Sequence, residues 1–386
     1  MRSAVSSDPI RVMVVDDSAV VRGLITRMLE DAADVSVVTS VPNGEAAVKA
    51  LDRYDIEVVL LDIEMPVMDG MTALPLMLKK RPDLKVIMAS TLTLHNADIS
   101  LRALELGAID YIPKPTATRE MTGGLDFKRE LLDKVKALGD SLRRSGRRQA
   151  AQPARPGQPA RVPFQRPGAA PGAARPSLLT PAAPPKLRQN KIEPPDLIAI
   201  GSSTGGPQAL FKVLGDLRQG GGLKQPIIIT QHMPATFTTI LAEHITRVTG
   251  WPAKEGQDGE TLKGGNVYVA PGGFHMTVES KGTETVLRIL DAPPENFCKP
   301  AVDPMLRSVA KVYGRRALAV ILTGMGSDGA KGGGVLVEAG GSVIAQDEET
   351  SVVWGMPGAV AQAGLCTAIL PVQDIGAFIR KVAARL

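Results

Sequence analysis

A low-complexity segment divides this chain and limits the folds that are open to it. Residues 140–190 are rich in Pro, Ala, Gly and Arg and have almost no periodic apolar pattern. Such a segment buries too little apolar surface to fold and is typical of a flexible linker. The sequence therefore predicts two globular domains, over 8–135 and 191–386, each long enough to bury its own core.

The positive charge of the chain is concentrated in this linker. The net charge is +5, yet residues 141–190 contain ten Arg or Lys and no acid. The rest of the chain therefore sums to about −5. We expect the arginines to solubilise a tether rather than to bind an acidic partner. Aromatic residues are few, and neither helix-turn-helix nor zinc-ligand spacing is evident, so no nucleic-acid partner is predicted.

Cysteine content and hydropathy indicate the cellular compartment. Only Cys298 and Cys366 are present, which provides no disulfide framework and suits a reducing environment. No apolar run is as long as a membrane span, and the N-terminus lacks the apolar core of a signal peptide. We therefore expect a cytoplasmic protein that does not insert into membranes.

Apolar runs alternate with helical periodicity in the N-terminal domain. Strands are expected at 10–15, 35–38, 58–61, 86–89 and 109–112, with helical stretches between them. This alternation is typical of a parallel α/β sheet, whose ligands lie at the carboxyl ends of the strands. The first domain is therefore predicted to be a doubly wound α/β fold.

Acidic residues come directly after two of these strands. Asp16 and Asp17 follow the first strand, and Asp62 ends the third. Clustered carboxylates repel one another unless they share a cation, and Mg²⁺ is the hard ion that such oxygen ligands prefer. Ser90 and Lys114 come from neighbouring strand ends and would face the same cluster. The sequence therefore predicts a Mg²⁺ site formed by the three aspartates.

The same motifs resemble those of response-regulator receiver domains. Residues 10 to about 130 contain VVDDS, LDIEMPVMDG, AST and IPKP. The resemblance implies that Asp62 accepts a phosphoryl group while the three aspartates hold Mg²⁺. Lys114 would neutralise charge on the phosphoryl oxygens. Ser90 would turn toward the new phosphate and reset the face around Tyr111.

Strand signals resume after the linker. Seven strands are expected, at 197–200, 226–230, 266–270, 285–290, 317–323, 342–345 and 367–370. Helical stretches separate most of them, and 266–290 has the pattern of a hairpin. The second domain is therefore predicted to be another doubly wound parallel α/β fold.

The stretch LIAIGSSTGGP, over 197–207, reads as a buried strand, a tight Gly-rich turn and the start of a helix. This arrangement presents a side chain at the carboxyl edge of a parallel sheet, with free backbone N–H groups to stabilise an anion. A nucleophilic Ser202 or Ser203 fits such a place. A phosphate or nucleotide loop is the alternative, although GSSTGG matches neither nucleotide-loop signature.

A nucleophilic serine needs a base, and four histidines are available. His232 directly follows the strand PIIITQ and is expected at the same sheet edge. His275 in APGGFHM is the second candidate. His95 lies in the first domain, and His244 falls in an amphipathic helix, where a capping or surface role is expected.

A carboxylate must then orient the imidazole. Asp328 follows the strand LAVILT in the turn TGMGSDGA, among small residues that allow close backbone approach. Asp303 and Asp347 are weaker candidates. The resulting order of Ser, His and Asp differs from that of the familiar serine hydrolases, so the site would be an independent arrival at the triad.

Taken together, the motifs resemble the family of chemotaxis-specific protein-glutamate methylesterases, in which a receiver is fused to a serine hydrolase. The matching stretches are IGSSTGGPQAL, ITQHMP, YVAPGGFHM, PAVDPML, ILTGMGSDGA and SVVWGMP. The resemblance implies that Ser203 is the nucleophile, His232 the base and Asp328 the orienting acid. It also implies that Thr204 and the Met325 backbone N–H lie near the oxyanion.

The resemblance further implies a substrate and a mode of regulation. The substrates would be glutamate γ-methyl esters, and also glutamines, on the helical cytoplasmic bundle of chemotaxis receptors, hydrolysed without a metal. A chemotaxis histidine kinase would supply the phosphoryl group, and the receiver would inhibit until it is phosphorylated.

One departure from the family pattern and one alternative function accompany this interpretation. The loop PPENFCKPAVD departs from the family at Phe297, Cys298 and Lys299, where a more basic, His-containing sequence is usual. If this loop contacts substrate, the substrate preference would differ. The alternative function is a response regulator with a non-catalytic output domain, but it leaves the three residues expected at strand ends unexplained.

Overall fold

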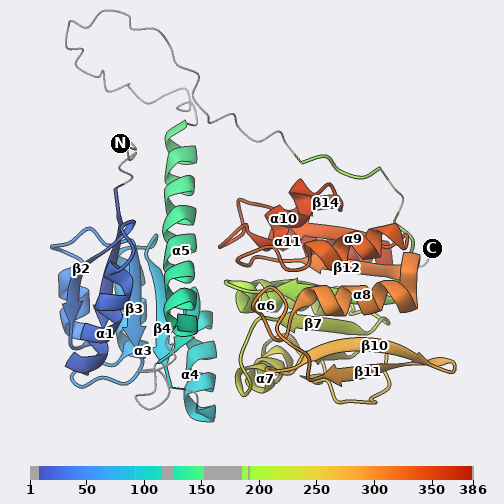
Figure 1. Ribbon diagram of the computed structural model, residues 1–386, viewed down its shortest axis with the longest axis horizontal. Helices are drawn as coiled ribbons and strands as arrows, with labels where there is room; N and C mark the ends of the chain where they lie inside the picture. The colour runs from blue at the N-terminus through green and yellow to red at the C-terminus, as the bar shows by residue number, and fades with distance from the viewer. Residues whose placement is uncertain (1–7, 92, 115–124, 152–184, 190–191, 385–386) are drawn as a thin grey trace, which may run out of the picture.

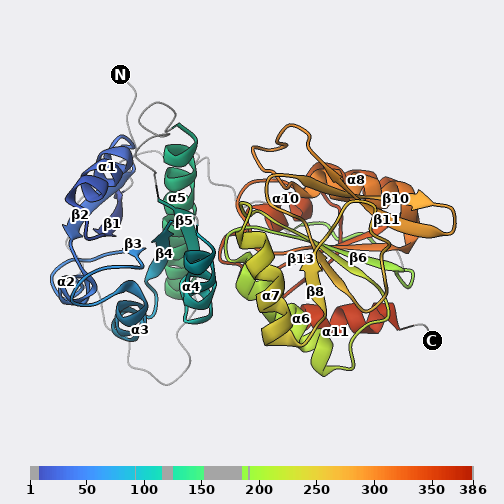
Figure 2. The same ribbon diagram turned by 90° about the horizontal axis from the view of Figure 1, so that it is seen from below.

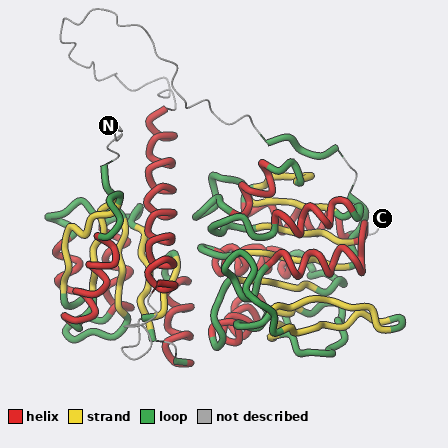
Figure 3. Tube along the Cα trace, viewed as in Figure 1, coloured by secondary structure: helices red, strands yellow, loops and turns green. Residues whose placement is uncertain are grey.

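The computed structural model describes residues 8–91, 93–114, 125–151, 185–189 and 192–384. They form two α/β domains that lie side by side, with both sheets flanked by helices (Figures 1 and 3). Most of the predicted linker lies outside the described residues. None of the described helices is long and apolar enough to span a bilayer.

The first domain is a five-stranded parallel sheet in the order β2-β1-β3-β4-β5. The central strand β3 is buried throughout. Its elements are β1 Ile10–Val15, α1 Ala19–Glu30, β2 Val35–Val41, α2 Gly44–Ala50, β3 Val58–Asp62, α3 Gly70–Lys80, β4 Lys85–Ser90, α4 Leu94–Glu105, β5 Asp110–Pro113 and α5 Leu125–Ala151. The predicted fold of this domain is therefore confirmed.

Helix α5 continues beyond the point where the sequence indicates a linker. The linker was expected from residue 140, but the helix ends at Ala151. The Arg143 guanidinium makes two hydrogen bonds of 2.8 Å to the buried Glu57 carboxylate. The Ser141 hydroxyl also donates to Val352 O of the second domain at 2.6 Å. These tertiary contacts stabilise a helix where composition alone indicates none.

The second domain contains a seven-stranded, fully parallel sheet in the order β14-β13-β12-β6-β7-β9-β8. Its strands are β6 Leu197–Ser202, β7 Ile227–Gln231, β8 Ala253–Glu255, β9 Val267–Val269, β10 His275–Lys281, β11 Glu284–Leu290, β12 Ala317–Ile321, β13 Ser342–Gln346 and β14 Cys366–Leu370. Its helices are α6 Gly206–Gln219, α7 Phe237–Thr249, α8 Val302–Tyr313, a 3₁₀ turn Gly314–Arg316, α9 Ala330–Glu338, α10 Met356–Gln362 and α11 Val372–Ala383.

The hairpin of the second domain differs in position from the prediction. Strands β10 and β11 form the antiparallel pair, whereas β9 joins the main sheet beside β7. Strand β9 has only three residues, all of them buried. From the sequence alone, so short an apolar run does not show whether the strand belongs to a hairpin or to the main sheet. The strand β8, also three residues long, was not predicted because two of its three residues are charged and none is fully buried.

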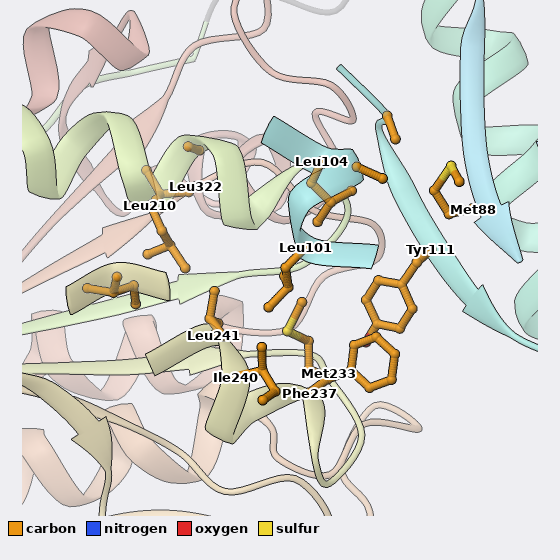
Figure 4. Close-up of a cluster of buried hydrophobic side chains, with 14 of the residues drawn as sticks. Met88, Leu101, Leu104, Tyr111, Leu210, Met233, Phe237, Ile240, Leu241 and Leu322 are labelled. Atoms are coloured by element: carbon orange, nitrogen blue, oxygen red, sulfur yellow. The ribbon is translucent and has the colours of Figure 1, made fainter. Parts of the chain in front are cut away.

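The two domains meet along a face formed by α4, β5 and α5 of the first domain (Figure 2). Figure 4 shows buried side chains of both domains in one cluster, with Leu101 and Leu104 on one side and Leu241 on the other. Within this cluster the Tyr111 and Phe237 rings stack with centroids 4.2 Å apart and planes within 6°. The interface is therefore an apolar core that extends the core of the second domain.

Candidate active site

The serine turn follows β6 and precedes α6. Pro207 occupies the first turn of α6, as the sequence predicts. Gly205 has a φ of 74°, and a Cβ there would lie 2.5 Å from Val352. Both the left-handed backbone and the close approach require glycine at this position. The turn is therefore fixed tightly against the loop before α10.

The structure separates the two serines of the turn. Ser202 is fully buried in β6 and donates its hydroxyl to Gln231 Oε1 at 2.6 Å. The backbone of Ser203 is held by Thr323 O at 3.0 Å and by Gln231 Nε2 at 2.9 Å. Among the described residues, no group hydrogen-bonds to the Ser203 hydroxyl. Ser203 therefore carries the hydroxyl that is available for chemistry.

His232 lies at the neighbouring strand end. Ser202 and Gln231 are register partners on β6 and β7, so the residues that follow them, Ser203 and His232, leave the sheet side by side. The His232 backbone N–H donates to Ser202 O at 3.1 Å. Its ring Nε2 lies 2.8 Å from Asp328 Oδ2, which fixes the proton on Nε2. Nδ1 is therefore the ring nitrogen that is left to exchange a proton with Ser203.

Asp328 is held by an unusual number of donors for a buried carboxylate. Besides His232, it accepts from three backbone N–H groups and one side-chain amide, at 2.6–3.0 Å, namely Val302, Asp303, Gly329 and Asn296. Burial favours protonation of the carboxyl group, but these hydrogen bonds hold its pKa below the ordinary value. Asp328 is therefore an ionised, rigidly aimed partner for the imidazole.

Asp303, a weaker candidate for the acid, lies in the same cage but touches no histidine. It is fully buried and accepts from the N–H groups of Gly329 and Gly332 at 3.0 and 2.7 Å. The Asn296 amide donates to both Asp303 and Asp328 at 2.9 Å. Burial and the neighbouring Asp328 charge raise the pKa of Asp303. Asp328 accepts more hydrogen bonds than Asp303, and the pKa values of the two carboxyl groups are therefore shifted in opposite directions.

The other competing residues have local structural partners. His275 is buried, with Nδ1 accepting from the Ala301 N–H at 3.1 Å and Nε2 lying 2.9 Å from Pro293 O. Both of its ring nitrogens are therefore occupied by the main chain. Asp347 accepts from the N–H and the hydroxyl of Thr350 in a local turn. Neither His275 nor Asp347 is positioned to serve Ser203.

The loop over 293–300 reaches the free nitrogen of the candidate base. Cys298 Sγ lies 3.4 Å from His232 Nδ1. Burial opposes the charge on His232, but the hydrogen bonds with Asp328 and Cys298 outweigh it and raise the pKa of His232 to about 10. Sequence reasoning singled out this loop as a departure from the family. It did not place Cys298 on the base or Asn296 on Asp328.

Thr204 and Met325 flank the serine. Thr204 is almost fully buried and donates its hydroxyl to Asp110 Oδ2 of the first domain at 2.9 Å. Gly324 packs so closely on Ser203 that a Cβ at Gly324 would lie 2.8 Å from the serine Cβ. The next residue, Met325, has an N–H without a hydrogen-bond partner among the described residues. This N–H is therefore available to an anion beside Ser203.

The first domain has its own cluster of charged residues at the carboxyl edge of its sheet. One carboxylate oxygen from each of Asp16, Asp17 and Asp62 lies within 4.8 Å of the others. Lys114 Nζ lies 2.8 Å from Asp16 and 2.6 Å from Asp62. Burial, aided by the Asp16 charge and opposed by Lys114, raises the pKa of Asp62 to about 6. The donor set of three carboxylates suits Mg²⁺.

Ser90 and Tyr111 connect this cluster with the domain interface. Ser90 is buried at the end of β4, and its hydroxyl accepts from Ser100 of α4 at 3.0 Å. Tyr111 is also buried, and its ring stacks on Phe237 of α7. A movement of Ser90 would therefore be felt by α4, which is one of the elements in the interface.

His244 does not have the surface role that the sequence suggested. It is almost fully buried, with Nε2 2.8 Å from Asp98 Oδ1 and Nδ1 3.2 Å from Glu105 Oε1. Both acids belong to α4 of the first domain. The helical pattern correctly indicated the outer face of α7, but that face is covered by the other domain, which periodicity cannot reveal.

The chain is similar to known proteins over nearly its whole length. The chain matches the family described as CheB methylesterase over residues 198–379 and the response regulator receiver domain over residues 12–126. It is 63% identical over 381 residues to the protein-glutamate methylesterase/protein-glutamine glutaminase 1 of Paramagnetospirillum magneticum, covering 98% of each chain. The same-named protein of Rhodospirillum rubrum is 61% identical, covering 97% of this chain and 95% of that protein.

A solved structure also matches the second domain. The crystal structure of the Thermotoga maritima CheB methylesterase catalytic domain is 38% identical, with a TM-score of 0.47, and covers 48% of this chain and 98% of that one.

Proposed function

The chain belongs to the CheB methylesterase family, and on this premise we propose which of its residues perform the reaction. It is a phosphorylation-regulated hydrolase that demethylates glutamate γ-methyl esters and deamidates glutamines on chemotaxis receptors. We assign the nucleophile to Ser203, the base to His232 and the orienting acid to Asp328. The observation that carries this assignment is the His232–Asp328 pair beside the one available hydroxyl of the turn.

The reaction follows from these positions. Ser203 Oγ attacks the ester carbonyl carbon, and His232 Nδ1 takes the hydroxyl proton because Nε2 is already bonded to Asp328. The imidazolium returns this proton to the leaving methoxide, and methanol departs. Water then attacks the acyl-enzyme with His232 again as base, which restores Ser203 and leaves the glutamate carboxylate. With a glutamine substrate the leaving group is ammonia.

The oxyanion of each tetrahedral intermediate needs preorganised donors. The Met325 N–H has no partner among the described residues and lies in the loop that packs on Ser203. We assign it to the oxyanion, with Thr204 nearby. In this structure the Thr204 hydroxyl is bound to Asp110. The docked receiver therefore engages a residue of the site as well as covering it.

The two serines provide the test of the assignment. Ser203→Ala should lower methanol release from methyl-labelled receptor membranes by several orders of magnitude, because no other hydroxyl of the turn is available. Ser202→Ala is the matched control. It loses only the hydrogen bond to Gln231 and should retain most of the activity. Equal losses in the two variants would show that the nucleophile has been misassigned.

For the receiver, we propose that Asp62 is the phosphorylated residue and that it holds Mg²⁺ together with Asp16 and Asp17. The fit rests on three carboxylates crowded within 4.8 Å and faced by Lys114. When bound, Mg²⁺ would neutralise charge on the phosphoryl oxygens. Asp62 would supply the attacking carboxylate oxygen, and Lys114 would remain as a fixed cation beside it.

The partners and the regulation follow from the family and from the interface. We propose a chemotaxis histidine kinase as phosphodonor and the cytoplasmic helical bundle of methylated receptors as substrate, which places the enzyme in the cytoplasm. The α4-β5-α5 face lies against the active-site edge of the hydrolase, through the Tyr111–Phe237 stack and the Asp110–Thr204 bond. Phosphorylation would alter Ser90 and this face and so release the receiver.

A further inference from the structure

The Cys298 thiol contacts the ring nitrogen of His232 that the reaction requires. Cys298 Sγ is 3.4 Å from His232 Nδ1, within the hydrogen-bonding reach of sulfur. Because Nε2 is bonded to Asp328, Nδ1 is the only ring nitrogen that is left to take the Ser203 proton. Among the described residues, the Ser203 hydroxyl has no hydrogen bond of its own. The thiol therefore occupies the place that the hydroxyl must take.

The loop that carries this thiol is held in a strained conformation. Asn296 and Phe297 have φ values of 51° and 62°, a left-handed region in which non-glycine residues are uncommon. Such conformations persist only when surrounding contacts impose them. On the hydrolase side, the Asn296 amide is fixed by Asp303 and Asp328.

On the other side the loop is held by the receiver. The Phe297 side chain points outward, and the residue is 80% exposed. Its ring lies under the Arg129 guanidinium of α5, with Cζ 4.0 Å from the ring centroid. Cation–π contacts of this kind are weak at exposed sites but directional. The position of the loop is thus connected to the docked position of α5.

We propose that Cys298 is an inhibitory residue through which the docked receiver disables the base. While α5 is docked, Arg129 holds Phe297, and the loop keeps the Cys298 thiol on His232 Nδ1. The imidazole then cannot accept the Ser203 proton. When the receiver leaves, the loop relaxes and frees Nδ1. The proposal rests on the assigned roles of Ser203 and His232. In it the docked receiver inhibits in two ways, by covering the site and by blocking the base.

A small substrate separates this inhibition from simple covering. A docked domain excludes a receptor helix, but a single capped amino acid such as N-acetyl-glutamate γ-methyl ester methylamide is much less affected. With this ester and no phosphodonor, the intact wild-type chain should release methanol slowly. Cys298→Ala should release it roughly three- to tenfold faster, the range of one net hydrogen bond. Acetyl phosphate with Mg²⁺ should bring both chains to similar rates.

A conservative variant tests whether the hydrogen bond itself is responsible. The hydroxyl of Cys298→Ser can still form a hydrogen bond with Nδ1, so this variant should stay close to the wild-type basal rate. Hydrogen–deuterium exchange of α4 and α7 should be unchanged in Cys298→Ala. Its faster reaction then occurs with the receiver still docked, which covering alone does not explain.

Arg129 provides the connection to the receiver. Arg129→Ala should also raise the basal rate, and the double variant with Cys298→Ala should be no faster than Cys298→Ala alone, because both changes end the same contact of Cys298 with His232. Lys128→Ala is the matched control, since Lys128 on the same helix pairs with Asp31 inside the receiver. It should leave the basal rate unchanged.

Two outcomes would overturn the proposal. If Cys298→Ala matches the wild-type basal rate while acetyl phosphate still activates both chains, the thiol does not inhibit, and the proposed function is unaffected. If no chain hydrolyses the ester or labelled receptors even with the phosphodonor, the proposed function fails, and the inhibitory role of Cys298 fails with it.

Discussion

Asp62 of the receiver and Asp328 of the hydrolase occupy equivalent places in two similar folds. Each lies at the carboxyl edge of a parallel sheet, and each is only 2% exposed. Yet burial raises the pKa of Asp62 to about 6, whereas the pKa of Asp328 lies below the ordinary value. Two aspartates with the same exposure thus have pKa values that are shifted in opposite directions.

The number of donors explains the difference. Asp328 accepts hydrogen bonds from three backbone N–H groups, the Asn296 amide and His232. Among the described residues, Asp62 is faced by the Lys114 ammonium and the Ile63 backbone N–H, and it is crowded by the carboxylate of Asp16. The hydrogen-bonding capacity of Asp328 is therefore filled, which suits a residue that orients the His232 imidazole. Asp62 remains under-satisfied, which suits a group that receives a cation and a phosphoryl group.

The largest expected effect is that of a substitution at Asp328. Asp328→Asn should lower methanol release by roughly 10⁴, because an amide no longer fixes the proton of His232 on Nε2. Asp303→Asn is the matched control within the same cage. Asp303 touches no histidine, so its loss should cost far less activity. A small loss in Asp328→Asn, together with a large loss in Asp303→Asn, would assign the orienting acid to Asp303.

A substitution at Asp62 should affect regulation rather than basal activity. Asp62→Asn should retain basal methanol release and lose the response to acetyl phosphate with Mg²⁺. That response in the wild-type chain should be roughly 5- to 150-fold, the usual range of coupling between two sites. Activity of each chain on labelled receptor membranes, with and without the phosphodonor, measures both quantities. An Asp62→Asn chain that is still activated would exclude Asp62 as the phosphorylated residue.

Much of the fold could be predicted because local signals agreed with tertiary structure. Buried runs such as 197–200 and 58–61 became central strands. The prediction was wrong at residue 140, where α5 continues. There the contact of Arg143 with Glu57, 86 positions away, outweighs local composition.

The candidate site could be predicted only in part, for the same reason. His232 and Asp328 could be proposed because each lies in the turn that follows a buried strand, and strand order brings such turns together. The Cys298 contact with His232 depends on the path of a loop, and Thr204 meets Asp110 across a domain boundary. Neither contact leaves a periodic pattern in the sequence.

Measuring the acidity of the two aspartates tests this account most directly. The carboxyl ¹³C shifts of aspartate-labelled intact chain should be followed against pH, with Asp62→Asn and Asp328→Asn used to identify each signal. Asp62 should titrate with a pKa of about 6 and so be protonated below that pH, while Asp328 should stay ionised below the ordinary value of 3.8. An Asp62 signal titrating near 3.8, or an Asp328 signal titrating above it, would contradict the account.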